Sequence, residues 1–190
     1  MVREQIDEIE GNQNEAKNQE LSQNDVLDII REHQDIARFL TFKVDNELYG
    51  VDLLSIREIK GWTETTGLPN SPVFMKGVIN LRGAVIPIFD LKGRFDMGET
   101  NATEKHVVII IAVGQRLVGI LVDAVSDIIE VSQNDIKQAP QMEMKVDDKF
   151  VKGLISLDDK MVVVLDIHNL FDSKDIKNDG NRKPDMKAES

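Results

Sequence analysis

Three aspartates stand where chemistry is often found, directly after runs of mostly apolar residues that predict strands. They are Asp90, Asp123 and Asp166. In a doubly wound α/β protein, carboxylates at strand ends can be catalytic or accept phosphate. That arrangement needs parallel strands joined by long crossovers, usually helices. This sequence supplies hairpin turns instead, so we expect the three aspartates to cap the turns that follow the strands.

The other chemistry-bearing residues give no catalytic pattern. His33, His106 and His168 lie far apart and lack the spacing of a metal site. The absence of cysteine excludes disulfides, thiolate metal sites and cysteine nucleophiles. The sequence contains neither a phosphate-binding loop nor a Gly-x-Ser-x-Gly nucleophile elbow. We therefore expect no enzyme, no cofactor and no metal.

The charge is negative and unevenly distributed. The net charge is −11, and residues 1–37 hold ten acidic against three basic side chains. Nucleic-acid binding needs a basic surface that releases counterions from the phosphates, and the sequence has no Lys/Arg cluster of that kind. We therefore expect no nucleic-acid partner. Met1–Glu10 has no apolar core typical of a signal peptide, and the longest apolar run, Val107–Val113, is too short to cross a bilayer. The sequence predicts a cytoplasmic protein without direct membrane insertion.

The two ends of the chain differ from its middle. Residues 1–37 form an acidic extension that we expect to be partly helical, because apolar side chains recur there at helical spacing: Val26, Ile29, Ile30, His33 and Ala37. Such a helix either packs on the body of the protein or binds a partner. Residues 173–190, rich in Lys, Asp and Asn, predict a disordered tail.

Between these ends, the pattern indicates short antiparallel strands. One hairpin turns at Asp45-Asn46 and a second at Arg82-Gly83. Asp52 precedes three residues that predict a short capped helical turn. Pro87 suggests that its strand lies at an edge or a bulge.

The second half of this region repeats the first. A shift of 69 residues aligns Gly50 with Gly119, and a shift of 76 aligns Gly77 with Gly153 and Asp90 with Asp166. Each half has about five short strands, a set that usually closes on itself to hide its edges. We therefore expect a mainly β fold of two barrels, spanning residues 38–104 and 105–172.

Four segments resemble the CheW family of bacterial chemotaxis coupling proteins: Leu48–Ile59, Leu68–Gly83, Val85–Leu91 and Gly114–Asp127. The resemblance covers about residues 38–172 and implies two tandem five-stranded SH3-like barrels. It also implies a non-catalytic adaptor that couples the cytoplasmic tips of membrane chemoreceptors to the regulatory domain of the histidine kinase CheA. The alternative is a CheV-like or scaffold adaptor that joins the array without activating the kinase.

The resemblance further implies a receptor-binding surface near the groove between the barrels. The matching positions are Ile56, Glu58, Gly77, Arg82, Val107 and Ile128. Such a groove would accept a helical receptor tip, with polar groups fixing its register. Glu58 and Arg82 could pair there, since a guanidinium can hold a carboxylate with two hydrogen bonds. The simpler alternatives are an exposed ion pair worth less than about 1 kcal/mol and core packing for the aliphatic side chains.

Overall fold

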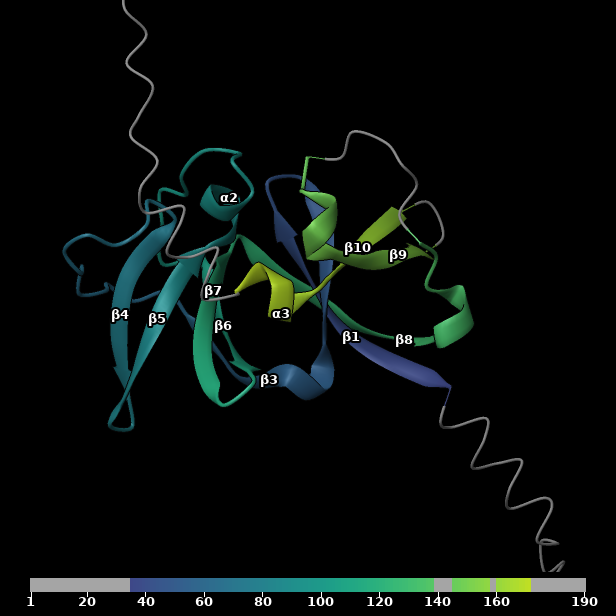
Figure 1. Ribbon diagram of the computed structural model, residues 1–190, viewed down its shortest axis with the longest axis horizontal. Helices are drawn as coiled ribbons and strands as arrows, with labels where there is room; N and C mark the ends of the chain where they lie inside the picture. The colour runs from purple at the N-terminus through teal and green to yellow at the C-terminus, as the bar shows by residue number, and fades with distance from the viewer. Residues whose placement is uncertain (1–34, 139–144, 158–159, 172–190) are drawn as a thin grey trace, which may run out of the picture. The chain divides into compact units, whose positions relative to one another are not determined.

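The computed structural model describes residues 35–138, 145–157 and 160–171 (Figure 1). The chain divides into two units, Met1–Asp35 and Ile36–Ser190, and all the elements below belong to the second. The expected tail, and nearly all of the expected acidic extension, lie outside the described residues. Ala37, which we expected on a helix, lies in a strand instead.

The described residues form ten strands and a few very short helices. The strands are β1 (Ile36–Val44), β2 (Glu47–Asp52), β3 (Ile56–Gly61), β4 (Met75–Leu81), β5 (Ala84–Asp90), β6 (Val107–Val113), β7 (Arg116–Val122), β8 (Ala124–Ser132), β9 (Val151–Leu157) and β10 (Lys160–Leu165). The helices are η1 (Leu53–Ser55), α2 (Leu91–Arg94), η2 (Gln133–Asp135), η3 (Asp148–Phe150) and α3 (Ile167–Leu170). The expected turns at Asp45-Asn46 and Arg82-Gly83 join β1 to β2 and β4 to β5.

Two five-stranded sheets result. Barrel A has the strand order β8-β1-β2-β10-β9 and barrel B the order β3-β6-β7-β5-β4. Two short antiparallel bridges link the ends of these sheets. Lys137, after β8, exchanges two hydrogen bonds with Leu154 of β9, and Thr66, after β3, does the same with Val78 of β4. The expected fold class, mainly β with two five-stranded barrels, is confirmed.

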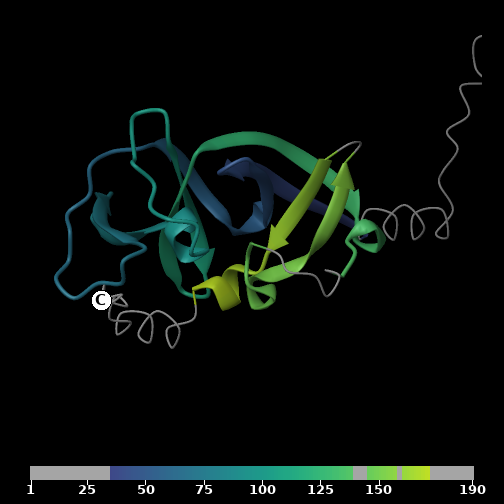
Figure 2. The ribbon, with the colours of Figure 1, turned by 90° about the horizontal axis from the view of Figure 1, so that it is seen from above.

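The barrels do not follow the expected division at residues 104 and 105. Barrel B is built from one continuous segment, β3 to β7, whereas barrel A combines β1 and β2 with β8 to β10 (Figures 1 and 2). The physical reason is an exchange of partners between the two repeats. The third strand of each repeat pairs with the first strand of the other, as Ile56 with Ile111 and Phe42 with Val125. Self-similarity reveals equivalent strands but not which copy supplies the partner.

The reciprocal pairing relates the two repeats by an approximate two-fold rotation. Gly50 of β2 lies opposite Val164 in a parallel ladder, and its equivalent Gly119 lies opposite Ile88. A Cβ on Gly119 would overlap the Ile88 side chain and come within 3.0 Å of Val108 Cγ1. The glycine is therefore needed for the close approach of this parallel strand.

Both faces of the central strands are buried, which explains apolar runs without strict alternation. Along β6, Val108 and Ile110 join a cluster inside barrel B. Ile109 and Ile111 face the opposite way, into a larger core that also contains Phe42 of barrel A. The two barrels thus share one apolar core in addition to their own interiors.

Candidate functional site

Two of the three strand-end aspartates act as helix caps, as the sequence predicted. Asp90 accepts hydrogen bonds from Lys92 N at 3.1 Å and from Thr100 N and Oγ1 at 2.7 Å each. Asp166 accepts from the backbone N–H groups of His168 and Asn169. These partners occupy the carboxylate oxygens and stabilise the start of α2 and α3.

The remaining candidates for chemistry do not assemble into a reactive site. Asp123 lies between β7 and β8, with Oδ1 3.8 Å from His106 Nε2. His106 accepts a hydrogen bond from Thr103 N through Nδ1. His168 lies exposed on α3, and His33 lies outside the described residues. Within the described ranges, no group of three or more His, Cys, Asp or Glu side chains could hold a metal ion.

The Glu58–Arg82 pair suggested by the sequence is present. Arg82 Nη2 lies 3.0 Å from Glu58 Oε2. Glu58 belongs to β3 and Arg82 to the β4–β5 turn, so the pair joins the two ends of barrel B's strand order. The arginine side chain is 82% exposed and the glutamate 26%. Such an exposed pair adds little stability, and the guanidinium remains accessible to a partner.

The backbone at Arg82 is unusual for an arginine. Its φ is +51° and that of Gly83 is +89°, the two positive values that favour a tight hairpin turn. Asn80 Oδ1 accepts a hydrogen bond from Gly83 N and helps to hold the turn. A left-handed conformation costs a residue other than Gly or Asn about 1 kcal/mol. The turn therefore does not itself favour arginine, and the side chain needs another explanation.

The other predicted site residues are dispersed. Ile56 and Val107 are half-buried against the shared core, near opposite ends of the β3–β6 ladder. Ile128 is 52% exposed on β8 of barrel A, opposite Leu40. Gly77 is buried, so it contributes no surface. The structure therefore brings only Glu58 and Arg82 into direct contact.

Gly77 has a clear structural reason to be glycine. Its φ is +130°, a region that side chains rarely adopt. A Cβ there would overlap Thr66 O and lie 2.9 Å from Thr65 Oγ1. The residue thus lets β4 approach the segment that closes barrel B.

Sequence reasoning missed an exposed leucine beside these residues. Leu54 lies in η1, between β2 and β3, and is 83% exposed. Asp52 caps this turn through a 2.9 Å hydrogen bond from Leu54 N, as predicted. The available signal was a capped turn of three residues, too short to bury a large apolar side chain.

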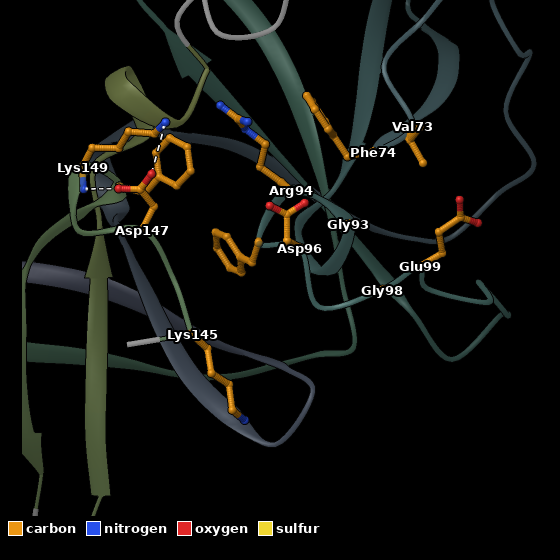
Figure 3. Close-up of a pocket in the computed structure, with 12 residues that line it drawn as sticks. Val73, Phe74, Gly93, Arg94, Asp96, Gly98, Glu99, Lys145, Asp147 and Lys149 are labelled. Carbon is orange, nitrogen blue, oxygen red and sulfur yellow. Dashed lines mark hydrogen bonds and ion pairs between the residues drawn. The ribbon is translucent and has the colours of Figure 1, made fainter. Parts of the chain in front are cut away.

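A separate groove of about 560 Å³ lies between α2 and the segment that contains η3. Figure 3 shows Val73 and Glu99 on one side and Lys145, Asp147 and Lys149 on the other. Arg94 lines the groove and is only 7% exposed. Its guanidinium carbon lies 4.8 Å from the Phe74 ring centroid and 4.5 Å from that of Phe150. Phe74 belongs to the first repeat and Phe150 to the second, so Arg94 contacts an aromatic ring from each repeat.

Near this groove, Lys145 binds the start of β2. Its Nζ lies 2.8 Å from Glu47 Oε1, and Glu47 Oε2 accepts a 3.0 Å hydrogen bond from the hydroxyl of Tyr49. Burial of the phenol, together with the adjacent Glu47 carboxylate, raises the pKa of Tyr49 well above its usual value.

Residues 38–175 match the family described as CheW-like domain. The chain belongs to this family. It is 39% identical over 139 residues to the probable chemotaxis protein CheW of Rhizobium etli, which covers 73% of this chain and 90% of that relative. It is also 39% identical over 138 residues to the chemotaxis protein CheW of Klebsiella aerogenes, covering 73% and 83%.

A solved CheW structure agrees with the fold. The crystal structure of the scaffolding protein TtCheW from Thermoanaerobacter tengcongensis matches with a TM-score of 0.67 and 34% identity, covering 72% of this chain and 88% of that one. The resemblance inferred from the sequence is therefore confirmed, and with it the role of a CheW-like chemotaxis coupling adaptor. In the part of the chain that the structure describes, no helix is long and apolar enough to cross a membrane.

Proposed function

We propose that this chain couples the cytoplasmic tips of methyl-accepting chemoreceptors to the regulatory domain of the histidine kinase CheA. It acts as an adaptor without catalysis of its own, in the cytoplasm, where it is recruited to membrane receptor clusters. Membership of the CheW-like family supports this role. The acidic net charge argues against nucleic acid as a further partner.

The receptor-facing surface in this proposal is organised by six residues: Ile56, Glu58, Gly77, Arg82, Val107 and Ile128. Arg82 is the observation that carries the proposal, because an exposed arginine is held in a backbone conformation that disfavours it. Glu58 orients the guanidinium toward the receptor tip. Exposed Ile128 supplies apolar contact of the kind that anchors a helix in a groove.

The three less exposed residues act indirectly. Ile56 and Val107 hold β3 against β6, and Gly77 lets β4 approach the closing segment. Substitution of these residues would alter receptor binding by moving Glu58 and Arg82. Their loss would therefore also lower stability, unlike loss of Arg82.

The test is reconstitution of receptor-containing membranes with CheA, with and without this chain, while the phosphate flux through the kinase is measured. We expect the chain to raise the flux and to make it responsive to attractant. Binding to the membranes without any rise in flux would support the alternative adaptor that joins the array without activating the kinase. Absence of binding to both receptor membranes and CheA would refute the proposed function.

A further inference from the structure

Arg94 is a buried arginine that links the two barrels. It is the last residue of α2, which follows β5 of barrel B, and it is only 7% exposed. Its Nε donates a 3.2 Å hydrogen bond to the carbonyl oxygen of Leu170, which ends α3 after β10 of barrel A. Its guanidinium carbon also lies 4.5 Å from the ring centroid of Phe150, which ends η3 just before β9 of barrel A. The side chain therefore reaches from one barrel to the other.

This contact lies close to the approximate two-fold axis that relates the repeats, because Arg94 and Leu170 are equivalent under the 76-residue shift. The rings that flank the guanidinium, Phe74 and Phe150, are also equivalent to each other. Figure 3 shows the Arg94 side chain beside Phe74. An arginine at both positions would bring two like charges together in a buried region, where water screens them poorly. The repeat therefore holds a single arginine at this point.

Other contacts between the barrels are of a different kind. Phe95, just after α2, lies 5.2 Å from Tyr49 of β2, measured between ring centroids. Such apolar contacts favour burial without fixing a direction, whereas a hydrogen bond restricts both distance and angle. Lys92 of α2 forms a 3.3 Å ion pair with Asp45 of the β1–β2 turn, but both side chains are partly exposed to water, so this pair adds little. Arg94 supplies a buried, directional contact that these do not.

We propose that Arg94 is a positioning residue that fixes the orientation of barrel A relative to barrel B and thereby sets the receptor-binding surface. The effect on the receptor rests on the proposed function, in which Glu58 and Arg82 of barrel B act together with Ile128 of barrel A. A partner that contacts both barrels binds well only in one orientation, because its apparent affinity falls with the fraction of molecules that hold the competent state. Since Arg94 is buried, it acts through the packing of the barrels and not by touching the partner.

The test separates stability from orientation in the full chain. Arg94→Met keeps a long side chain but removes the charge and the hydrogen bond to Leu170. Replacing a buried ionic group by an apolar one of similar volume is often neutral for stability or raises it. The midpoint of urea denaturation should therefore not fall.

Orientation is measured as the distance distribution between two spin labels, one on each barrel. The chain has no cysteine, so two introduced cysteines are the only labelling sites. Val85→Cys on β5 and Met161→Cys on β10 suit this purpose, because the two positions are equivalent in the repeat and are 69% and 53% exposed. We expect a narrow distribution with Arg94 present and a broader one with Arg94→Met.

Two further substitutions grade this result. Arg94→Lys should broaden the distribution less than Arg94→Met, because lysine keeps the charge and a donor but lacks the planar group that stacks on both rings. Lys76→Met is the matched control, because Lys76 is a partly buried cation that pairs with Asp90 within barrel B at 3.5 Å. It should leave the distribution unchanged. In chains without labels, the affinity for a receptor-tip fragment should fall about fivefold with Arg94→Met if the competent fraction falls to about one fifth.

An unchanged distribution with Arg94→Met would overturn the proposal. Equal broadening with Lys76→Met would also overturn it, because lower stability would then explain the effect. A label pair within barrel B, Val85→Cys with Arg116→Cys, should not respond to Arg94→Met, and an equal response there would show that barrel B itself had loosened. If the unmodified chain binds no receptor tip while Arg94→Met still broadens the distribution between the barrels, the proposed function fails but the positioning role of Arg94 stands.

Discussion

Substitution of Arg82 should weaken receptor binding while leaving the stability of the fold almost unchanged. Replacing it with asparagine removes the ion pair with Glu58, which is exposed and worth at most about 1 kcal/mol. Asparagine tolerates the left-handed backbone, so it recovers up to about 1 kcal/mol of the conformational cost. Because the two terms oppose each other, Arg82→Asn should change the free energy of unfolding by less than about 1 kcal/mol.

Receptor binding should respond very differently. Loss of a charged hydrogen bond at an interface costs about 1–3 kcal/mol. This corresponds to an affinity for the receptor tip that is weaker by roughly 5-fold to 150-fold. Arg82→Ala should lose a similar amount. Arg82→Glu should lose more because it repels Glu58, and adding Glu58→Arg should partly restore binding.

The assay combines urea denaturation with calorimetric titration of a receptor-tip fragment. Arg116→Asn is the matched control, because Arg116 is an exposed arginine beside the β6–β7 turn of the same barrel. We expect the control to bind as the unmodified chain does. Unchanged binding by Arg82→Glu would refute the reasoning, and so would a loss of binding fully explained by unfolding.

Three further predictions concern the fold. Gly119→Ala should destabilise the protein by about 1–3 kcal/mol in urea, because its Cβ would overlap the Ile88 side chain. Gly77→Ala should cost at least about 2 kcal/mol, because a positive φ and overlap with Thr66 O act together. Its receptor binding should fall further than the unfolded fraction explains, because the displaced β4 moves Arg82 relative to Glu58. Tyr49, the chain's single tyrosine, should stay neutral in the folded state above pH of about 10, its usual pKa. The stability it contributes is present below that pH and is lost as pH rises further, so phenolate absorbance should appear together with unfolding.

Much of the fold could be predicted from the sequence because glycines and helix-capping aspartates recur at equivalent positions of the two repeats. Gly50 and Gly119 both lie in parallel ladders, and Asp90 and Asp166 both cap helices. The exchange of strands between repeats was not predictable in the same way. It depends on η1 carrying the chain from one barrel to the other, and the local pattern around Leu53 is the same whichever barrel receives β3.

Pro87 follows the rule that proline avoids positions where a sheet needs its N–H, although its strand is not at the edge of the sheet. We expected its strand to lie at an edge or a bulge. β5 is not an edge, because it lies between β7 and β4, but the β4–β5 ladder has a register shift close to Pro87, between Met75 and Gly77. The parallel ladder between β5 and β7 begins only at Ile88. Pro87 therefore lies outside that ladder, where its missing N–H removes none of the ladder's hydrogen bonds.

The candidate site was less predictable because burial depends on contacts distant in sequence. Glu58 and Arg82 are 24 positions apart in the chain, and only closure of barrel B brings their side chains together. Gly77 looked like a surface residue, but the Thr65–Thr66 segment covers it. No pattern within either segment specifies that contact.

A difference between equivalent positions is not by itself a sign of function. Arg94 and Leu170 are equivalent, both buried, and each fits its surroundings: the guanidinium stacks on two rings, and the leucine fills the shared core. Arg82 and its equivalent Asp158 also differ, but packing does not explain the arginine, since its side chain is 82% exposed. Turn geometry does not explain it either, because φ is +51°. We therefore propose that the accessible guanidinium of Arg82 contacts a partner while Glu58 holds it in place.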